Sequence, residues 1–257
     1  MLGKAVRRVS TGLSLCGSLG RYLGLEAARW SGGSKPRPVH LRYNACGAVW
    51  MRNGTTDYPT LVSCFVKGFH RPLQPLPPRP TILDIGANVG YTLVDFRHHH
   101  PDARLIGVEM DADNHALASR NVEGLGNVQL LRAAVWCEDG EVRYDASADA
   151  DAFAVGSGGA AQRSVEALTM GTLLDRCGVS RADYVKLDIE GAEKDLFERG
   201  ELGWLQRVEQ ISIELHGTLK APELMALLRE HGFQAAKDAR HWDTVVAWRS
   251  TAGTAAQ

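Results

Sequence analysis

A pair of glycines after one apolar run and an acid at the end of the next have a spacing that suits the binding of a nucleotide. Gly86 and Gly90 follow the β-branched run at 81–85, and Glu109 ends a second apolar run at 104–109. Glycine has no Cβ, so position 86 would let a ligand lie against the backbone, and position 90 would let the next helix pack close to its strand. An acid about 20 residues beyond such glycines accepts hydrogen bonds from ribose hydroxyls in Rossmann-type units. We therefore expect Glu109 to bind a ribose.

The charge of the turn distinguishes between possible cofactors. A dinucleotide site requires G-x-G-x-x-G, whereas here Asn88 takes the place of a glycine and Asp84 lies two residues before Gly86. Asn88 is expected to cap the helix that follows. The Asp84 carboxylate would repel a pyrophosphate but not a cationic ligand that carries an amino acid and a ribose. The pattern favours S-adenosylmethionine over a dinucleotide, and the alternative is an ordinary strand-to-helix turn with a solvated Glu109.

A second group of acids follows the apolar run at 183–187. Asp188 comes directly after it, and Glu190 and Glu193 come next. Ligands of open α/β sheets bind at the carboxyl ends of the strands, so the Asp188 carboxylate is expected to face the cleft beside Gly86. Glu190 and Glu193 should lie in the first turn of the next helix, where an acid favours the positive helix end, and capping is an equally good role for Glu193.

A third strand end carries an acid and a histidine. Glu214 and His216 are two residues apart, and side chains at that spacing share one face if the strand extends that far. Together they could bind or deprotonate a hydroxyl, because imidazole titrates near neutral pH and a carboxylate can orient it. The alternative is that His216 is a satisfied surface or cap histidine.

The elements that must position these residues alternate from residue 81 onward. Repeated strand–helix–strand units imply a parallel sheet with right-handed crossovers. The pattern predicts strands at 81–85, 104–109, 128–135, 183–187, 208–214, 233–237 and 244–248, and helices near 88–99, 113–123, 170–177, 191–199 and 221–231. Residues 136–169 interrupt the alternation with a short strand at 141–144 and a mobile loop or hairpin beside the site.

The chain before residue 81 has a different composition. Residues 1–35 are basic and rich in small residues, and we expect an arm whose helix covers one face of the domain rather than one attached to a membrane surface. A hairpin (39–43 and 48–52), a helix (57–69) and a proline-rich connection (72–80) follow. We therefore divide the chain into a basic arm (1–35), a hairpin and helix lid (36–80), a catalytic domain (81–250) and a disordered tail (251–257).

Composition excludes several other classes of protein. The chain has 257 residues, of which 44% are hydrophobic, so it can fill a substantial core. The formal net charge of −1 gives no general attraction to nucleic acid. Five cysteines without C-x-x-C spacing argue against a zinc site or a disulfide framework and favour a reducing, cytoplasmic location. No continuous apolar segment has the quality of a membrane span.

With these residues in hand, the chain resembles the FkbM-like family of class I S-adenosylmethionine-dependent methyltransferases over roughly residues 39–250. The resemblance rests on the motifs at 83–91, 108–109, 133–135, 185–193 and 213–217, and on the segment 52–57. It implies a Rossmann-like, seven-stranded, mostly parallel sheet with an antiparallel last strand, and usually O-methylation of a sugar or natural-product hydroxyl. The cofactor positions that it implies are Asp84, Gly86, Ala87, Asn88, Gly90, Tyr91, Glu109, Met110, Ala134, Thr56 and Asp57. The Ala-rich stretch at 145–161 departs from the family pattern, and it leaves the acceptor pocket unassigned.

The expected chemistry is transfer of a sulfonium methyl group to an acceptor hydroxyl of a small molecule or glycan. His216 is the preferred base and Asp188 the group that orients it, with Glu190 and Glu214 beside them. We expect no metal, although a divalent cation held by the carboxylates is an alternative way to lower the hydroxyl pKa. Two other functions stay open: an N-methyltransferase, although an Asn/Asp-Pro-Pro-aromatic motif is absent, and a degenerate cofactor-binding protein with a regulatory or scaffolding role.

Overall fold

The computed structural model describes residues 2–30, 35–42, 47–145 and 162–250. The expected tail at 251–257 lies outside these described residues, as does all but the first residue of the stretch 145–161. Residues 31–34 and 43–46 lie outside them as well, and Tyr43 is the last residue of the first expected hairpin strand.

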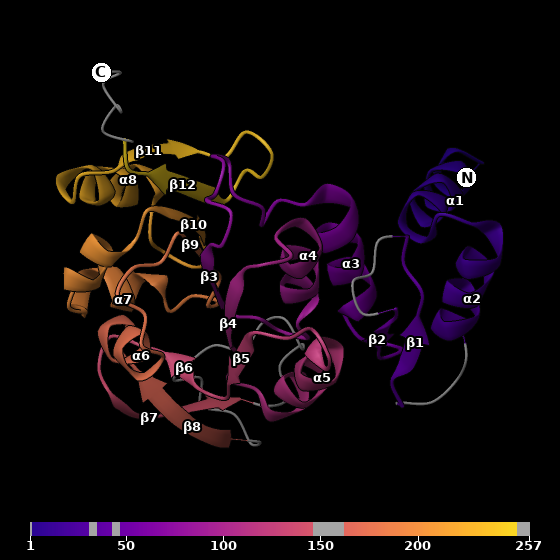
Figure 1. The fold of residues 1–257 in the computed structure, drawn as a ribbon, viewed down its shortest axis with the longest axis horizontal. Coiled ribbons are helices and arrows are strands. Elements are labelled where there is room, and N and C mark those ends of the chain that lie inside the picture. The colour runs from indigo at the N-terminus through magenta and orange to yellow at the C-terminus, as the bar shows by residue number, and fades with distance from the viewer. Residues whose placement is uncertain (1, 31–34, 43–46, 146–161, 251–257) are drawn as a thin grey trace.

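A seven-stranded sheet forms the centre of the protein (Figure 1). Its strand order is β11-β12-β10-β9-β3-β4-β5. The strands are β3 (Thr81–Ile85), β4 (Arg104–Val108), β5 (Val128–Leu131), β9 (Tyr184–Leu187), β10 (Gln210–Glu214), β11 (Gln234–Lys237) and β12 (Thr244–Trp248). Only β12, the last strand along the chain, runs antiparallel to its neighbours β10 and β11. The expected Rossmann-like, mostly parallel sheet with an antiparallel last strand is confirmed.

Helices cover both faces of this sheet. Along β3, Ile82 packs with Phe96 of α4 (Tyr91–His99), whereas Leu83 and Ile85 join the core on the opposite face. This alternation is the period-2 pattern of a strand that is buried on both sides. Helix α5 (Ala112–Val122) lies on the same face as α4. The opposite face is covered by α6 (Met170–Arg176), α7 (Glu193–Arg199), the 3₁₀ helix η2 (Gly203–Arg207) and α8 (Ala221–Glu230).

The strand order reverses between β3 and β9. From β3 the chain proceeds to β4 and β5 on one side, and it returns to place β9 and β10 on the other. Ligands of doubly wound sheets bind outside the carboxyl ends of the strands at such a switch point. Gly86 follows β3 and Asp188 follows β9, so two of the predicted motifs meet there.

A small second sheet interrupts the alternation. It has the order β6-β8-β7, with β6 (Ala134–Val135), β7 (Gly140–Asp145) and β8 (Gln162–Leu168). The strand expected at 128–135 is therefore split into β5 and β6. The expected short strand at 141–144 lies within β7, and its partner β8 was not predicted as a strand.

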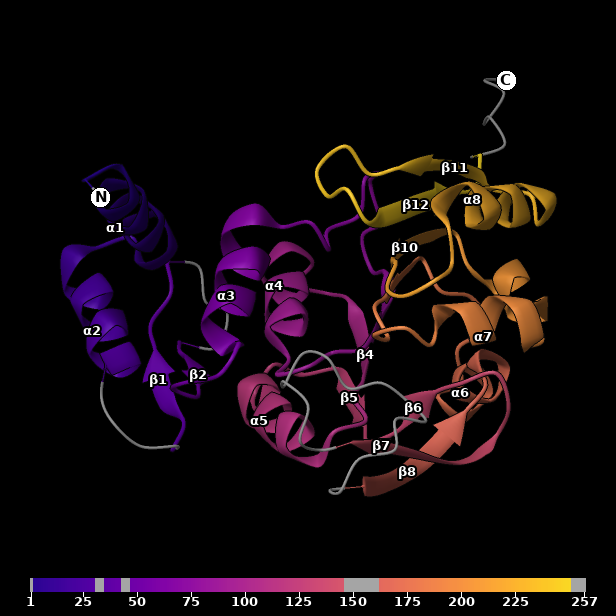
Figure 2. The same ribbon diagram turned by 180° about the vertical axis from the view of Figure 1, so that it is seen from behind.

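The N-terminal elements pack beside α4 and α5 (Figure 2). They are α1 (Leu2–Cys16), α2 (Leu19–Trp30), the antiparallel pair β1 (Arg37–Val39) and β2 (Val49–Met51), α3 (Asp57–Val62) and the π-helix η1 (Ser63–Lys67). Leu15 and Leu25 are buried in one cluster with Leu61 and Phe65, so α1 and α2 cover this side of the protein. Among the described residues, we find no helix whose length and apolar character would let it cross a membrane.

Candidate active site

The glycine turn after β3 packs directly against the end of β9. Gly86 has φ +80°, and its N–H donates to Val108 O over 3.0 Å. A Cβ on Gly86 would lie 1.7 Å from the carbonyl oxygen of Asp188, and one on Gly90 would lie 3.2 Å from Ala118 of α5. The Asp188 backbone thus requires glycine at 86, in addition to the ligand contact that the sequence predicts there. At 90 the close neighbour is α5, where the sequence analysis expected the strand.

Glu109 ties the second strand end to the turn. Its Oε2 accepts the N–H of Asn88 over 2.8 Å, and its Oε1 accepts the N–H of Asp111 over 2.8 Å. Burial raises the pKa of Glu109 to about 7, despite these two hydrogen bonds. The expectation that Asn88 caps α4 is wrong, because Asn88 has φ +49° and Gly90 is the N-cap residue.

A first cavity of about 580 Å³ opens over the ends of β3 and β4. Several residues singled out from the sequence lie in its wall: Gly86, Asn88, Glu109, Met110, Ala134, Asp188 and Glu190. Asn114, Ile189 and Ala192 also line it. A buried carboxylate, a mainly apolar floor and a glycine turn are a suitable set for a ribose and an adenine ring.

One of the predicted cofactor residues, Asp57, supports this wall from behind. Asp57 is buried and accepts hydrogen bonds from Arg52 Nε over 3.1 Å and Nη2 over 2.7 Å. Arg52 Nη2 also donates to Asn114 Oδ1 over 2.7 Å, and Asn114 lines the first cavity. Thr56 is the N-cap residue of α3 and does not line that cavity.

Asp84 is fully buried beneath the turn and lines neither this cavity nor the one beside it. It accepts a hydrogen bond from the Thr92 hydroxyl, and its Oδ1 lies 3.5 Å from Lys186 Nζ. The carboxylate therefore faces a lysine of β9. Its influence on a ligand is indirect.

Lys186 joins the two strand ends and was not identified from the sequence. Its Nζ donates to Gly86 O over 2.9 Å and lies 3.1 Å from Asp188 Oδ2. Burial opposes the charge, but Asp188 and Asp84 outweigh it and raise the pKa of Lys186. A lysine inside the otherwise apolar run Tyr184–Leu187 was the available signal, because a buried lysine requires anionic partners.

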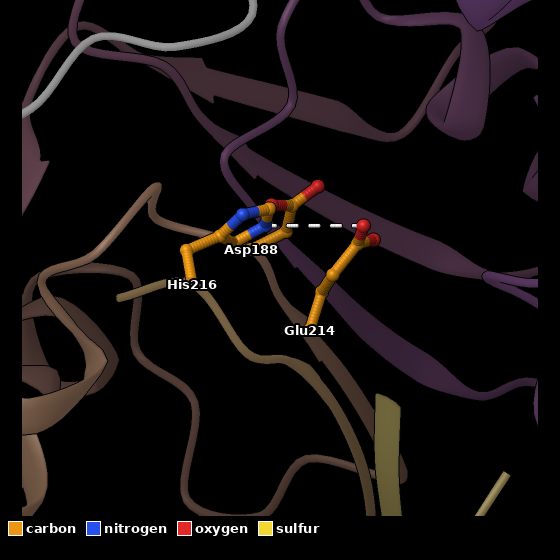
Figure 3. Close-up of side chains that lie close together, drawn as sticks. All are labelled: Asp188, Glu214 and His216. Atoms are coloured by element: carbon orange, nitrogen blue, oxygen red, sulfur yellow. Dashed lines mark hydrogen bonds and ion pairs between the residues drawn. The ribbon is translucent and has the colours of Figure 1, made fainter. Parts of the chain in front are cut away.

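The side chains of Asp188, Glu214 and His216 converge at the ends of β9 and β10, as Figure 3 shows. His216 Nε2 lies 3.1 Å from Asp188 Oδ1 and 3.8 Å from Glu214 Oε1, and His216 Nδ1 lies 3.4 Å from Glu190 Oε2. The hydrogen bond to Asp188 outweighs burial and, with Glu190 and Glu193, raises the pKa of His216 to about 9. Glu214 and His216 thus face one region, and the imidazole is cationic at neutral pH.

Glu190 and Glu193 were both expected in the first turn of a helix, and only Glu193 lies there. Glu190 has φ +51° and lies ahead of the helix, which begins at Glu193. Glu193 is buried and accepts the N–H groups of Ile189 and Gly191 over 3.2 and 3.0 Å. Burial raises the pKa of Glu193 to about 7. Glu193 therefore holds the loop that carries Glu190.

A second cavity, of about 750 Å³, lies on the other side of the turn. It shares Gly86, Asn88 and Asp188 with the first cavity. The predicted residues Ala87, Tyr91 and Glu214 line it, together with side chains that were not predicted: Thr60, Ser63, Cys64, Phe69, His70, Thr92, Lys186, Ser212, His241 and Thr244. Half of these come from α3, η1 and the segments around β12. Their place beside the ends of the central strands depends on tertiary packing.

Sequence comparison finds one family and one curated relative. The sequence profile described as the Methyltransferase FkbM domain matches residues 84–235, which is more than half of the chain. The methyltransferase sdnD of Sordaria araneosa is 23% identical over 203 residues, which cover 65% of this chain and 78% of the relative.

Solved structures with a similar arrangement are more distant. The fibrillarin pre-rRNA processing protein of Methanococcus jannaschii has a TM-score of 0.44 at 12% identity, and the match covers 86% of this chain and 87% of that one. The precorrin-6y C5,15-methyltransferase of Geobacter metallireducens GS-15 has a TM-score of 0.41 at 14% identity, with 67% and 81% covered.

Proposed function

This chain belongs to the FkbM family of S-adenosylmethionine-dependent methyltransferases, and on that premise we propose that it methylates a hydroxyl group of a sugar or of a natural-product-type small molecule. The observation that carries the proposal is the pair of cavities that share a wall at Gly86, Asn88 and Asp188. One cavity suits the methyl donor. The other offers room for an acceptor beside the carboxylates of Asp188 and Glu214. His216 lines neither cavity, and it reaches the shared wall through Asp188, whose Oδ1 lies 3.1 Å from His216 Nε2.

The first cavity fits the cofactor by the chemistry of its wall. We assign the ribose hydroxyls to Glu109, whose two oxygens are held in place by backbone N–H groups, and the adenine to the neighbourhood of Met110 and Ala134. The Gly86 turn and Asn88 remain for the amino-acid end. When bound, the cofactor supplies an activated methyl group. The protein must then align the donor with the acceptor, which is the larger part of catalysis in such a transfer.

The second cavity supports a hydroxyl acceptor. Asp188 and Glu214 present carboxylate oxygens that can accept a hydrogen bond from a hydroxyl, and Ser212 and Thr244 add hydroxyl groups. The Lys186 ammonium group is already engaged by Gly86 and Asp188, so it is poorly placed to bind an anionic acceptor. An uncharged, polar acceptor suits this wall best.

A base must accept the proton that the acceptor hydroxyl loses. We assign it to His216, held by Asp188 and Glu190, with Glu214 beside it. Because the pKa of His216 is about 9 in the free protein, only a small fraction of the imidazole can accept a proton at neutral pH. The rate should therefore increase with pH.

A divalent cation is a second route to the same activation. Asp188, Glu214 and His216 each offer one ligand atom, and these atoms lie within 4.8 Å of one another. A cation there would lower the pKa of a bound hydroxyl. Chelation with EDTA, followed by addition of Mg²⁺ or Mn²⁺, separates the two routes: activity that is lost and then restored supports the cation, and unchanged activity supports the histidine.

The division of the chain into an arm (1–35), a lid (36–80), a catalytic domain (81–250) and a tail (251–257) stays a prediction. We further propose a cytoplasmic location. In the described part of the chain, Cys16, Cys64, Cys137 and Cys177 are free and buried, as is expected in a reducing compartment.

Two measurements test the function. Calorimetry with S-adenosylmethionine should show binding, and an acceptor screen with labelled methyl donor on neutral glycosides and small metabolites should show transfer to oxygen. Labelling of nitrogen would favour an N-methyltransferase. Binding without transfer to any acceptor would favour a cofactor-binding protein, and no binding at millimolar cofactor would contradict both.

A further inference from the structure

Helix α2 has two apolar faces. Tyr22, Leu25 and Ala28 are buried against the rest of the protein. Leu19, Leu23, Ala27 and Trp30 recur at intervals of three and four residues, which places them on one stripe of the helix. The side chains of this stripe are exposed: Leu19 by 62%, Leu23 by 57% and Trp30 by 73%.

This exposed stripe, Leu19, Leu23 and Trp30, is not needed for packing against the domain. Figures 1 and 2 both place α1 and α2 at one end of the molecule, with α3 between them and α4. The indole N–H of Trp30 donates to Glu26 Oε2 over 3.3 Å. Val9 of α1 is a further exposed apolar residue, by 41%. Large apolar side chains gathered at one place on a surface mark an interaction site.

The charge around the stripe indicates what it meets. Residues 1–35 contain six basic residues and a single acid, Glu26, whereas the whole chain has a formal net charge of −1. The strong positive charge is thus confined to the segment that exposes the stripe. A second copy of the chain would bring like charges together, which is unfavourable. An anionic lipid surface complements both the charge and the apolar side chains.

We propose that α1 and α2 dock the protein on an anionic membrane surface. Leu19, Leu23 and Trp30 enter the boundary between headgroups and acyl chains, and the basic residues of the segment attract the lipid phosphates. Tryptophan is favoured at this depth because its ring is apolar and its N–H is polar. The attachment is peripheral, and it is independent of the methyl-transfer proposal.

The test is flotation of the full-length protein with vesicles. Wild type should float with vesicles that contain phosphatidylglycerol, and much less with vesicles of phosphatidylcholine alone. The triple variant Leu19→Ser, Leu23→Ser, Trp30→Ser should bind the anionic vesicles at least about tenfold less tightly, because the three apolar side chains that enter the lipid are lost. Arg7→Gln combined with Arg8→Gln should also weaken binding, and added salt should weaken wild type.

A matched control is Trp242→Ser. Trp242 is 77% exposed and lies between β11 and β12, far from α2 in the chain, so its replacement should leave flotation unchanged. Thermal melting of the serine variants should agree with wild type, since the side chains of Leu19, Leu23, Trp30 and Trp242 are exposed. The proposal is overturned by absence of flotation with anionic vesicles, by equal flotation of the triple variant, by equal binding to neutral vesicles, or by light scattering that detects a dimer which Leu23→Ser separates.

Discussion

The Cα atom of Gly86 lies so close to the carbonyl oxygen of Asp188 that a Cβ on Gly86 would stand 1.7 Å from that oxygen. The two strongest motifs of the sequence, 100 residues apart along the chain, are therefore in backbone contact. Lys186 reinforces this contact by donating to Gly86 O and pairing with Asp188 Oδ2. The wall between the two cavities is thus a junction of two strand ends that pack directly against each other.

Gly86→Ala should destabilise the protein much more than Gly124→Ala, although both glycines have the same φ. Both Gly86 and Gly124 have φ +80°, but a Cβ on Gly124 would meet nothing within 4 Å. We expect Gly124→Ala to cost about 1 kcal/mol, from the left-handed backbone alone, and Gly86→Ala several kcal/mol more. Urea denaturation of both variants measures this, and equal midpoints would show that the turn yields without cost.

The affinity for S-adenosylmethionine should depend on pH through Glu109. The pKa of this carboxyl is raised to about 7 by burial, so it is largely protonated below that pH. Ribose hydroxyls donate to the ionised form, so binding must release a proton at low pH, and the affinity should fall by up to about tenfold per pH unit below 7. Calorimetry at several pH values tests this. Glu109→Gln should bind weakly at every pH, and a flat wild-type profile would contradict the assignment.

The sequence predicted the central part of the fold because its elements are locally determined. The β-branched runs at β3 and β4 and the glycine turn between β3 and α4 depend on nearby residues, so the strands and the residues at their ends followed from the alternation. The same reasoning placed Asp188, Glu214 and His216 at one edge of the sheet, and the structure brings them together.

Other parts depend on contacts that are distant along the chain. Nothing near Asn88 shows that its N–H is taken by Glu109, so a capping role was the natural but incorrect expectation. The strand β8 is recognisable only through its pairing with β7 across 146–161, and the wall of the second cavity contains His70 and His241 from opposite ends of the chain. Lys186 was overlooked because two of its partners, Asp84 and Gly86, come from β3 and the turn that follows it.

Turnover should increase with pH toward about 9 if His216 is the base. Asp188, Glu190 and Glu193 raise the pKa of His216, so the imidazole is protonated below about pH 9. The fraction of neutral imidazole that can accept a proton therefore rises about tenfold per pH unit up to that value. His216→Asn should remove this slope and lower turnover by about 10² to 10³-fold. The measurement uses an acceptor found by the screen, with His98→Asn, a change at an exposed histidine of α4, as the control. A pH-independent wild-type rate, or unchanged turnover in His216→Asn, would exclude this role.

Lys186→Met should destabilise the protein through the carboxylates that it leaves behind. Lys186 is 9% exposed and is the cation that faces both Asp84 and Asp188. Removal of one partner of a buried ion pair costs about 3 to 5 kcal/mol, because the remaining charge is buried without compensation. Lys194→Met is the matched control: its lysine is exposed and pairs with Glu198 at 3.9 Å, so the change should stay within about 0.5 kcal/mol.

A second change distinguishes this charge effect from a simple loss of packing. If uncompensated charge is the cause, Asp84→Asn added to Lys186→Met should recover part of the lost stability, since it neutralises the fully buried carboxylate. A packing defect would instead be made worse, or left unchanged, by the second substitution. Denaturant midpoints of the wild type, both single variants and the double variant complete the cycle. Failure of the double variant to recover any stability would show that Asp84 and Lys186 do not act as a pair.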